Sequence, residues 1–242
     1  MAAQRSHPLL SIACCVVLPV LILHRCSAAG EAWYELGATP ALAVALSLPL
    51  GYGLWSLLSR SGGGFITLLG ILTTLLTGAV TIFAQTGEGE ALRPGTPWLY
   101  AAKEAALPLV VGVLFLITGT EAQRGSMLRI FFYTEELFHT REVEARVAEQ
   151  HREADYRALL GLVNCLLAGT FFASAVLNLL ISLHFQLPVL ELPAAQQAEA
   201  YNYAVGSITW WSWLIISFPA LVVIIGLALY LPRKLKQLTG EK

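Results

Sequence analysis

Six long apolar stretches, separated by shorter polar segments, dominate the pattern of this chain. An α-helix needs about 20 residues to cross the hydrocarbon core of a bilayer, because it rises about 1.5 Å per residue. Backbone N–H and C=O groups in hydrocarbon must bond within the protein, so each stretch is predicted to be a helix. The predicted membrane spans are residues 8–24, 39–58, 65–84, 98–118, 158–183 and 205–231.

Composition supports the same class of protein. Of the 242 residues, 56% are hydrophobic and 13% are charged, whereas a typical soluble domain has about 25% charged residues. The sequence therefore predicts an all-α, polytopic membrane protein with the lipid bilayer as its surroundings. A net charge of -1 gives no reason to expect a nucleic acid partner. The four cysteines form no CxxC pair, so neither a metal site nor a cofactor is predicted.

Basic residues are distributed unevenly between the predicted loops, and this asymmetry predicts the orientation. Arg25 and Arg93 fall on one side of the membrane. Lysine and arginine are enriched on the cytoplasmic side of membrane proteins, so both termini are predicted to be cytoplasmic. The basic residues on that side are Arg5, Arg60, Arg124, Arg129, Arg141, Arg146, Arg152, Arg157, Arg233, Lys234, Lys236 and Lys242.

Residues 119–157 form the only sizeable polar region and are predicted to be a cytoplasmic helical segment. Its first part, "MLRIFFYTEELFH", is aromatic and is expected to lie along the headgroup layer with three phenylalanines inserted, namely Phe131, Phe132 and Phe138. A helix start is expected at Thr134. Residues 141–157 are expected to extend the fifth span as one helix, with an i,i+4 ion pair between Glu142 and Arg146. The charged segment 135–155 is either a docking arm or a solvated helix.

Proline interrupts several of the predicted spans. It lacks an N–H and cannot bond the carbonyl four residues earlier, so a proline inside a helix kinks or breaks it. Kinks are predicted at Pro19, Pro108 and Pro219. The stretch "PLGYG", which includes Pro49 and Gly51, is expected to weaken the backbone of the second span.

Two charged residues lie inside the fourth predicted span, in "WLYAAKEAALPLVVG". Neighbouring residues on a helix point about 100° apart, so Lys103 and Glu104 are not expected to pair. The long stem of Lys103 is expected to reach outward to the headgroups. Glu104 is expected to face protein or a wet cavity, because a charge facing lipid is costly. Pro108 removes the donor for the carbonyl of Glu104, which indicates either an ion or proton site or a kink satisfied by a neighbouring helix.

Polar side chains follow single faces of two further spans. In the third span, the small and hydroxylic residues share one helical face and predict a packing seam; they are Thr67, Gly70, Thr74, Thr77 and Thr81. In the fifth span, Asn164 and Asn178 are fourteen residues apart and thus lie on nearly one face. Asn178 lies deep in an apolar stretch, where an unpaired amide is costly, so it is a candidate binding residue.

Three segments carry a resemblance to a known family. "PLGYGLWSL", "KEAALPLVVG" and "SAVLNLLIS", with six spans and a short basic tail, resemble an uncharacterised family of bacterial six-helix inner-membrane proteins that is distantly similar to the intracellular septation protein family. The resemblance implies a bacterial inner membrane and carries no activity or catalytic residue. The charged insertion at 135–155 departs from that pattern.

Two functions remain open on the sequence. The first is a transporter or channel for a small solute, ion or lipid headgroup, with a site near Glu104 that also includes Lys103, Asn178, Pro49 and Gly51. The alternative is an accessory or scaffold subunit of a bacterial envelope or division complex. The chain has no HExxH, P-loop or GxSxG motif, so it is predicted not to be an enzyme. A homo-oligomer or a larger membrane complex is expected. A polar cavity that reaches Glu104 would favour the transporter.

Overall fold

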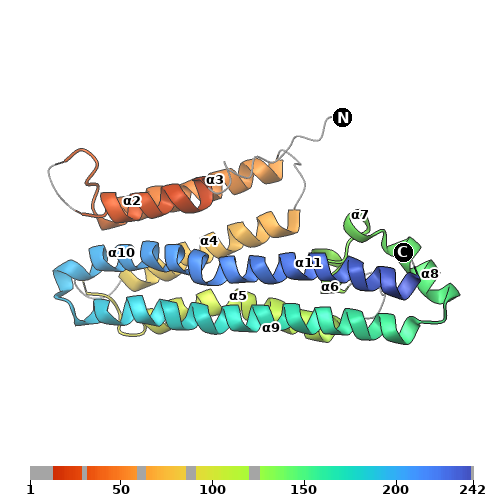
Figure 1. The fold of residues 1–242 in the computed structure, drawn as a ribbon. Coiled ribbons are helices and arrows are strands. Elements are labelled where there is room, and N and C mark those ends of the chain that lie inside the picture. Colours follow the sequence, from red (N-terminus) through yellow and green to blue (C-terminus); the bar gives the residue numbers. More distant parts are fainter. Residues whose placement is uncertain (1–12, 29–31, 59–63, 86–90, 120–125, 241–242) are drawn as a thin grey trace. The chain divides into compact units, whose positions relative to one another are not determined.

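The computed structural model describes residues 13–28, 32–58, 64–85, 91–119 and 126–240, and every regular element in these ranges is a helix (Figure 1). The predicted all-α class is therefore confirmed. The periodicity of the apolar stretches could not distinguish lipid-facing from protein-facing sides, because nearly every position in them is apolar.

Within the described residues, four helical segments are long and apolar enough to cross a membrane. Residues 8–12 of the first predicted span lie outside the described ranges, and its described α-helix, α2 (Leu18–Cys26), has 9 residues. The third predicted span corresponds to α4 (Gly64–Gln85), a helix of 22 residues. The total of six spans stays a prediction. The four segments indicate a membrane protein. These four are Ala38–Ser56, Thr96–Thr118, Glu153–Glu191 and Ala194–Thr239.

The chain divides into two compact units. The first unit contains Met1–Glu104 and Asn178–Leu214, and the second contains Ala105–Leu177 and Ile215–Lys242. Each unit has its own cluster of buried apolar side chains.

The first unit is built from α2, α3 (Ala38–Leu58), α4, the first part of α5 (Thr96–Thr118), the end of α9 (Glu153–Gln186), a 3₁₀ turn at Leu187–Glu191 and α10 (Ala194–Ser212). Helices α2 and α3 lie side by side (Figure 1). Burying apolar side chains contributes about 25 cal/mol per Å², so this core supplies much of the unit's stability. Its buried members are Leu23, Leu42, Ala45, Val80, Ala84, Leu92, Tyr100, Val189, Tyr201, Ala204, Val205 and Ile208.

Helix α10 contacts α2 very closely at Gly206. A Cβ at this position would lie 2.6 Å from Cδ2 of His24, so only glycine fits without displacing the imidazole. One turn earlier on α10, the side-chain amide of Asn202 donates to the carbonyl of Ala38 at 2.6 Å and to Oγ of Ser27 at 3.2 Å. These contacts fix both the end of α2 and the start of α3 against α10.

The second unit is built from the rest of α5, the short helices α6 (Met127–Phe131) and α7 (Glu135–Phe138), α8 (Thr140–Glu149), most of α9 and α11 (Phe218–Thr239). The expected helix start at Thr134 is confirmed, because α7 begins at the next residue. The expected insertion of phenylalanines into the headgroup layer is wrong for two of the three. Phe132 and Phe138 are 6% and 8% exposed, because they pack in the core of this unit with Tyr133 and Val147.

A polar network lies on the side of this core formed by α6, α8 and α9. The guanidinium of Arg129 pairs with the carboxylate of Glu144, whose Oε1 lies 3.2 Å from the hydroxyl of Tyr156. That hydroxyl lies 3.3 Å from the hydroxyl of Tyr133. Burial raises the pKa of the Tyr133 hydroxyl, so it remains protonated while its oxygen accepts the hydrogen bond from Tyr156.

The predicted continuous helix over 141–157 is wrong. Helix α8 ends at Glu149, and α9 begins at Glu153 after a turn in which His151 adopts a left-handed backbone conformation, with φ of 55°. The predicted ion pair between Arg146 and Glu142 is present, with an N···O distance of 2.6 Å. At the start of α9, Arg152 pairs with Asp155 and also donates to the carbonyl of Gln237 on α11. The turn thus lets α8 fold beside α11 (Figure 1).

The prolines fall into two groups. Pro19 and Pro219 are each the second residue of an α-helix that follows a π-helical turn, at Ala13–Val17 and Trp213–Ser217. A π-turn accommodates the carbonyl that proline leaves without its usual donor. Pro49 and Pro108 lie inside α3 and α5, which continue through them as helices. Helix α3 thus continues through the "PLGYG" stretch, and both its expected weakening and the kinks stay predictions.

Candidate functional site

Lys103 is the most deeply buried charged side chain among the described residues, with 2% of the side chain exposed. It lies on the part of α5 that belongs to the first unit. Its Nζ contacts three groups: Oε1 of Glu104 at 2.5 Å, Oγ1 of Thr77 at 2.6 Å, and the ring face of Tyr100, 4.3 Å from the centroid. An ammonium buried away from water needs such partners, because it has lost its hydration.

Two expectations about this site are wrong. Lys103 does not reach out to the headgroups, and it does pair with its neighbour Glu104. The directions of the two Cα–Cβ bonds differ by about 100°, but four carbons in lysine and two in glutamate bridge that angle. Low polarity around the ammonium makes a direct ion pair far stronger than it would be in water. The electrostatic energy of the ion pair therefore exceeds the cost in side-chain rotamer entropy of forming it.

A second layer of contacts connects the pair to two more helices. On α4, the hydroxyl of Thr81 donates to the carbonyl of Thr77 at 2.9 Å and lies 3.3 Å from the hydroxyl of Tyr201 on α10. The rings of Tyr201 and Tyr100 meet edge to face, with centroids 6.1 Å apart. The prediction that Thr77 and Thr81 share one face and form a packing seam is confirmed. The seam faces a charged site as well as a neighbouring helix.

Glu104 is the more accessible partner, with 24% of its side chain exposed. One carboxylate oxygen accepts from Lys103. Since α5 is helical through Pro108, the carbonyl of Glu104 also lacks the N–H that would normally bond it. A carboxylate and a carbonyl without its usual helical donor, on the same residue, are both acceptors and could hold a proton or a small cation.

The other predicted site residues are not joined to this pair. Pro49 and Gly51 lie on α3, where Gly51 is exposed and a Cβ added to it would meet no atom within 4 Å. Asn178 is half-buried on α9. Among the described residues, no hydrogen bond or ion pair connects any of these three to Lys103 or Glu104. The direct partners of the pair come from α4 and from α5 itself, and Tyr201 on α10 contacts those partners.

Asn164, which the sequence places on nearly the same face as Asn178, has a structural role in the second unit. Its side-chain amide donates to the carbonyl of Phe115 at 2.8 Å. Phe115 lies in the last turn of α5, where carbonyls have no partner within the helix. Asn164 therefore acts as a side-chain cap for α5. Its Oδ1 has no partner among the described residues.

Sequence reasoning missed two buried polar side chains on α9. Ser182 and Gln186 are both 0% exposed, and neither the Ser182 hydroxyl nor the Gln186 amide has a hydrogen-bond partner among the described residues. Buried polar groups are almost always bonded to protein or water, so these atoms have hydrogen-bonding capacity that the described residues do not fill. Their spacing of four residues in an apolar helix was the signal available in the sequence.

A cavity of about 210 Å³ lies in the second unit, at the facing sides of α8 and α11. Its lining does not include Glu104, so the expected cavity at Glu104 stays a prediction. Within the described ranges, no group of three or more His, Cys, Asp or Glu residues is placed to hold a metal ion.

No protein-family model, curated protein or solved structure matches this chain. The resemblance to the bacterial six-helix family accordingly stays a prediction from the three quoted segments.

Proposed function

We propose that this protein is a multi-pass membrane protein that moves a small solute, an ion or a lipid headgroup across the bilayer. Glu104 would be the group that takes up and releases the coupled proton or cation. The observation that carries the proposal is a buried lysine, neutralised by a part-exposed glutamate, within a helix long and apolar enough to cross a membrane. Ionisable groups at such positions are costly and are typically retained for function.

The contacts around Lys103 suggest how uptake at Glu104 would be transmitted. When a proton or cation neutralises the carboxylate, Lys103 keeps only Thr77 and the face of Tyr100 as partners. An uncompensated buried ammonium is destabilising. Occupancy of Glu104 therefore shifts the balance between the closed arrangement of α4, α5 and α10 and a looser one. A binding event that favours one of two arrangements is the basis of gating.

The remaining features of the proposal come from the sequence. They are six spans with proline kinks, a bacterial inner membrane, cytoplasmic termini and a homo-oligomeric assembly. The asymmetry of basic residues supports the orientation. The exposed apolar side chains of α11, such as Leu221, Val222 and Leu229, support contact with lipid or with another copy.

The proposal is tested with the full chain reconstituted into liposomes that contain a pH-sensitive dye. We expect an imposed K⁺ or Na⁺ gradient to drive proton movement with the wild type, and Glu104→Gln to abolish it. Glu142→Gln is the matched control, because it makes the same change in an exposed pair of the second unit. Absence of ion-dependent proton movement in the wild type, or equal movement with Glu104→Gln, would contradict a proton- or cation-coupled conduit.

An accessory or scaffold subunit is the second candidate, and a specific observation favours it. The three contacts of Lys103 are all internal, and they join helices as a purely structural pair would. In that case the polar surface of α7 and α8 would make the contacts with a partner. A scaffold predicts that Glu104→Gln is silent in cells, and that charge reversals at the exposed Arg141 and Glu149 release a partner that copurifies from native membranes.

A further inference from the structure

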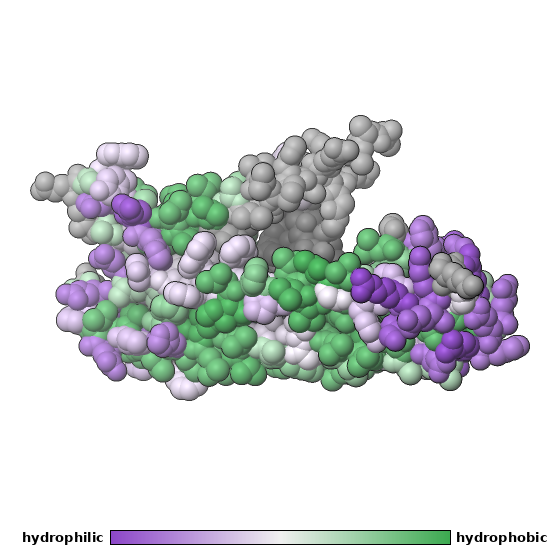
Figure 2. Space-filling model, viewed as in Figure 1, coloured by the Kyte–Doolittle hydropathy of each residue, from purple (hydrophilic) through white to green (hydrophobic). Residues whose placement is uncertain are grey.

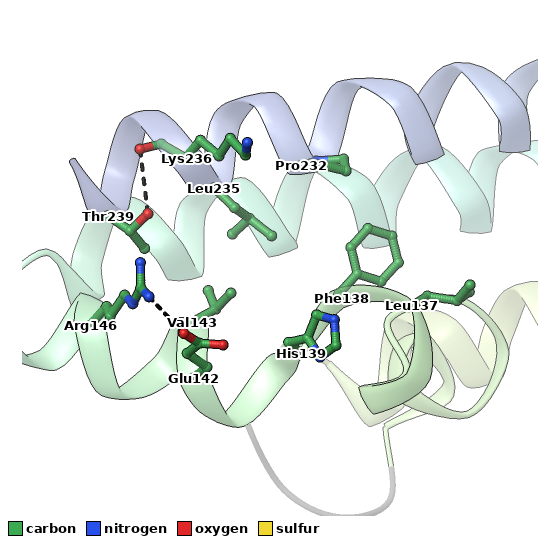
Figure 3. Close-up of a pocket in the computed structure, with 10 residues that line it drawn as sticks. All are labelled: Leu137, Phe138, His139, Glu142, Val143, Arg146, Pro232, Leu235, Lys236 and Thr239. Atoms are coloured by element: carbon green, nitrogen blue, oxygen red, sulfur yellow. Dashed lines mark hydrogen bonds and ion pairs between the residues drawn. The ribbon is translucent and has the colours of Figure 1, made fainter. Parts of the chain in front are cut away.

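The cavity of the second unit has an apolar floor and a charged rim (Figure 3). Phe138, Val143 and Leu235 contribute apolar atoms from α7, α8 and α11. The rim carries His139, Arg146 and Lys236, and Figure 3 shows these side chains around the opening. This combination of apolar walls with a few polar groups is typical of ligand sites.

The rim has an excess of positive charge. Glu142, its acidic member, is already paired with Arg146 at 2.6 Å. Lys236 has no carboxylate partner among the described residues. The whole of α11, from Phe218 to Thr239, contains no acidic residue. An anion entering the cavity would thus meet the ammonium of Lys236 on α11, while the guanidinium of Arg146 on α8, paired with Glu142, also lines the cavity.

The position of the cavity along α11 indicates the source of that anion. Up to Tyr230, α11 exposes large apolar side chains, including Leu221, Ile225 and Leu229. Basic residues begin at Arg233, immediately after the cavity-lining Pro232. Figure 2 shows this change from hydrophobic to hydrophilic surface along α11. The change marks where a membrane helix passes through the headgroup layer.

The volume of the cavity limits the size of the ligand. Small-molecule pockets typically measure about 300–1,000 Å³, so a cavity of about 210 Å³ is too small for a whole amphiphile. It has room for a polar headgroup. Leu137, 69% exposed at the rim, offers an apolar surface on which the start of an acyl chain can lie outside the cavity.

We propose that this cavity is a binding site for the headgroup of an anionic phospholipid. The phosphate accepts from the ammonium of Lys236 and from the rim groups on α7 and α8, while the acyl chains stay in the bilayer along α11. Basic residues next to a membrane span attract anionic lipids. The cavity would hold one such headgroup at a defined position. The site is independent of Glu104 and of any transport activity.

The test uses the full chain in neutral detergent and a fluorescent phosphatidylglycerol, whose binding is followed by anisotropy. The wild type is expected to bind it at least about tenfold more tightly than the matching phosphatidylcholine. Lys236→Glu should remove most of that preference. Lys234→Glu is the matched control, because it makes the same charge change two residues away, outside the cavity lining, at a lysine whose Nζ bonds Gln237. Val143→Phe, which fills the cavity without a charge change, should also weaken binding.

Three outcomes would overturn the proposal. The first is equal binding of both lipids by the wild type, which is measured without any variant. The second is an equal loss of affinity in the two lysine variants, which would indicate diffuse surface charge in place of a cavity. The third is competition by soluble glycerol phosphate as strong as that by unlabelled phosphatidylglycerol, which would make the ligand a free phosphate ester. Gel filtration and thermal unfolding of each variant show whether a loss of binding reflects a loss of fold.

Discussion

The ion pairs Lys103–Glu104 and Arg146–Glu142 have similar chemistry and N···O distances of 2.5 and 2.6 Å, but their surroundings differ. In the first unit, the lysine and glutamate side chains are 2% and 24% exposed. In the second unit, the arginine and glutamate are 37% and 62% exposed. Water screens the second pair and can replace either partner. Water cannot replace a partner lost from the buried Lys103. The two pairs therefore contribute unequally to the free energy of unfolding, although their N···O distances are nearly equal.

The largest effect is expected from Glu104→Leu. The substitution leaves the buried ammonium of Lys103 without its counter-charge, and we expect it to lower the free energy of unfolding by about 3 kcal/mol. Equilibrium unfolding in detergent micelles measures this change. The double variant Lys103→Met with Glu104→Leu should recover most of the loss, because no charge remains to be compensated. A double variant as unstable as the single one would show that the pair is not the source of the effect.

Asn164→Leu should have the next largest effect. It removes the bond from the side-chain amide to the carbonyl of Phe115, a buried residue in the last turn of α5, at a cost of about 1–3 kcal/mol. Asn178→Leu is the matched control on the same helix. Since Asn178 is half-buried and no hydrogen bond of the described residues would be lost, its unfolding free energy should change by less than about 0.5 kcal/mol. Equal losses for the two variants would contradict the capping role of Asn164.

The exposed pair should contribute little. A double-mutant cycle with Glu142→Gln and Arg146→Met should give a coupling energy of about 0.3–0.5 kcal/mol, the value typical of i,i+4 pairs on a helix surface. The coupling should fall as salt is raised from low to high concentration. A coupling energy as large as that of Lys103–Glu104, measured in the same detergent, would remove the contrast between the two units.

The smallest effect concerns Glu135 and pH. A hydrogen bond from the hydroxyl of Thr140 lowers the pKa of the exposed Glu135 carboxyl below its usual value. A lowered folded-state pKa adds stability above the pKa of the unfolded chain, and this stability is lost as pH falls through the folded-state pKa. Thr140→Val should therefore raise the pKa of Glu135 toward its usual value. Titration of the glutamate carboxyl carbons by NMR measures this shift, and an unchanged pKa would exclude the hydroxyl as its cause.

The sequence predicted the helical class and most helix positions, because the length of an apolar stretch is a local property. It could not predict which helices meet. Asn164 and Asn178 share a helical face by periodicity, yet they belong to different compact units. The turn at 150–152 was missed because no glycine or proline marks it; His151 adopts the left-handed conformation instead. The pairing of Lys103 with Glu104 was missed because helical geometry fixes the Cβ direction and leaves the rest of a long side chain free.

The contacts of Asn202 and Gly206 with α2 have a consequence for how the chain is made. Ser27 and Asn202 are 175 residues apart, so α2 can make its contacts with α10 only after most of the protein has left the ribosome. At about 5–20 residues per second, that delay is on the order of ten to thirty-five seconds. During that time Leu23, buried in the finished protein, has no final neighbour on α10. The contacts of α2 with α10 are thus among the last to form, and a truncated product that stops before residue 202 would lack them while retaining α3 beside α2.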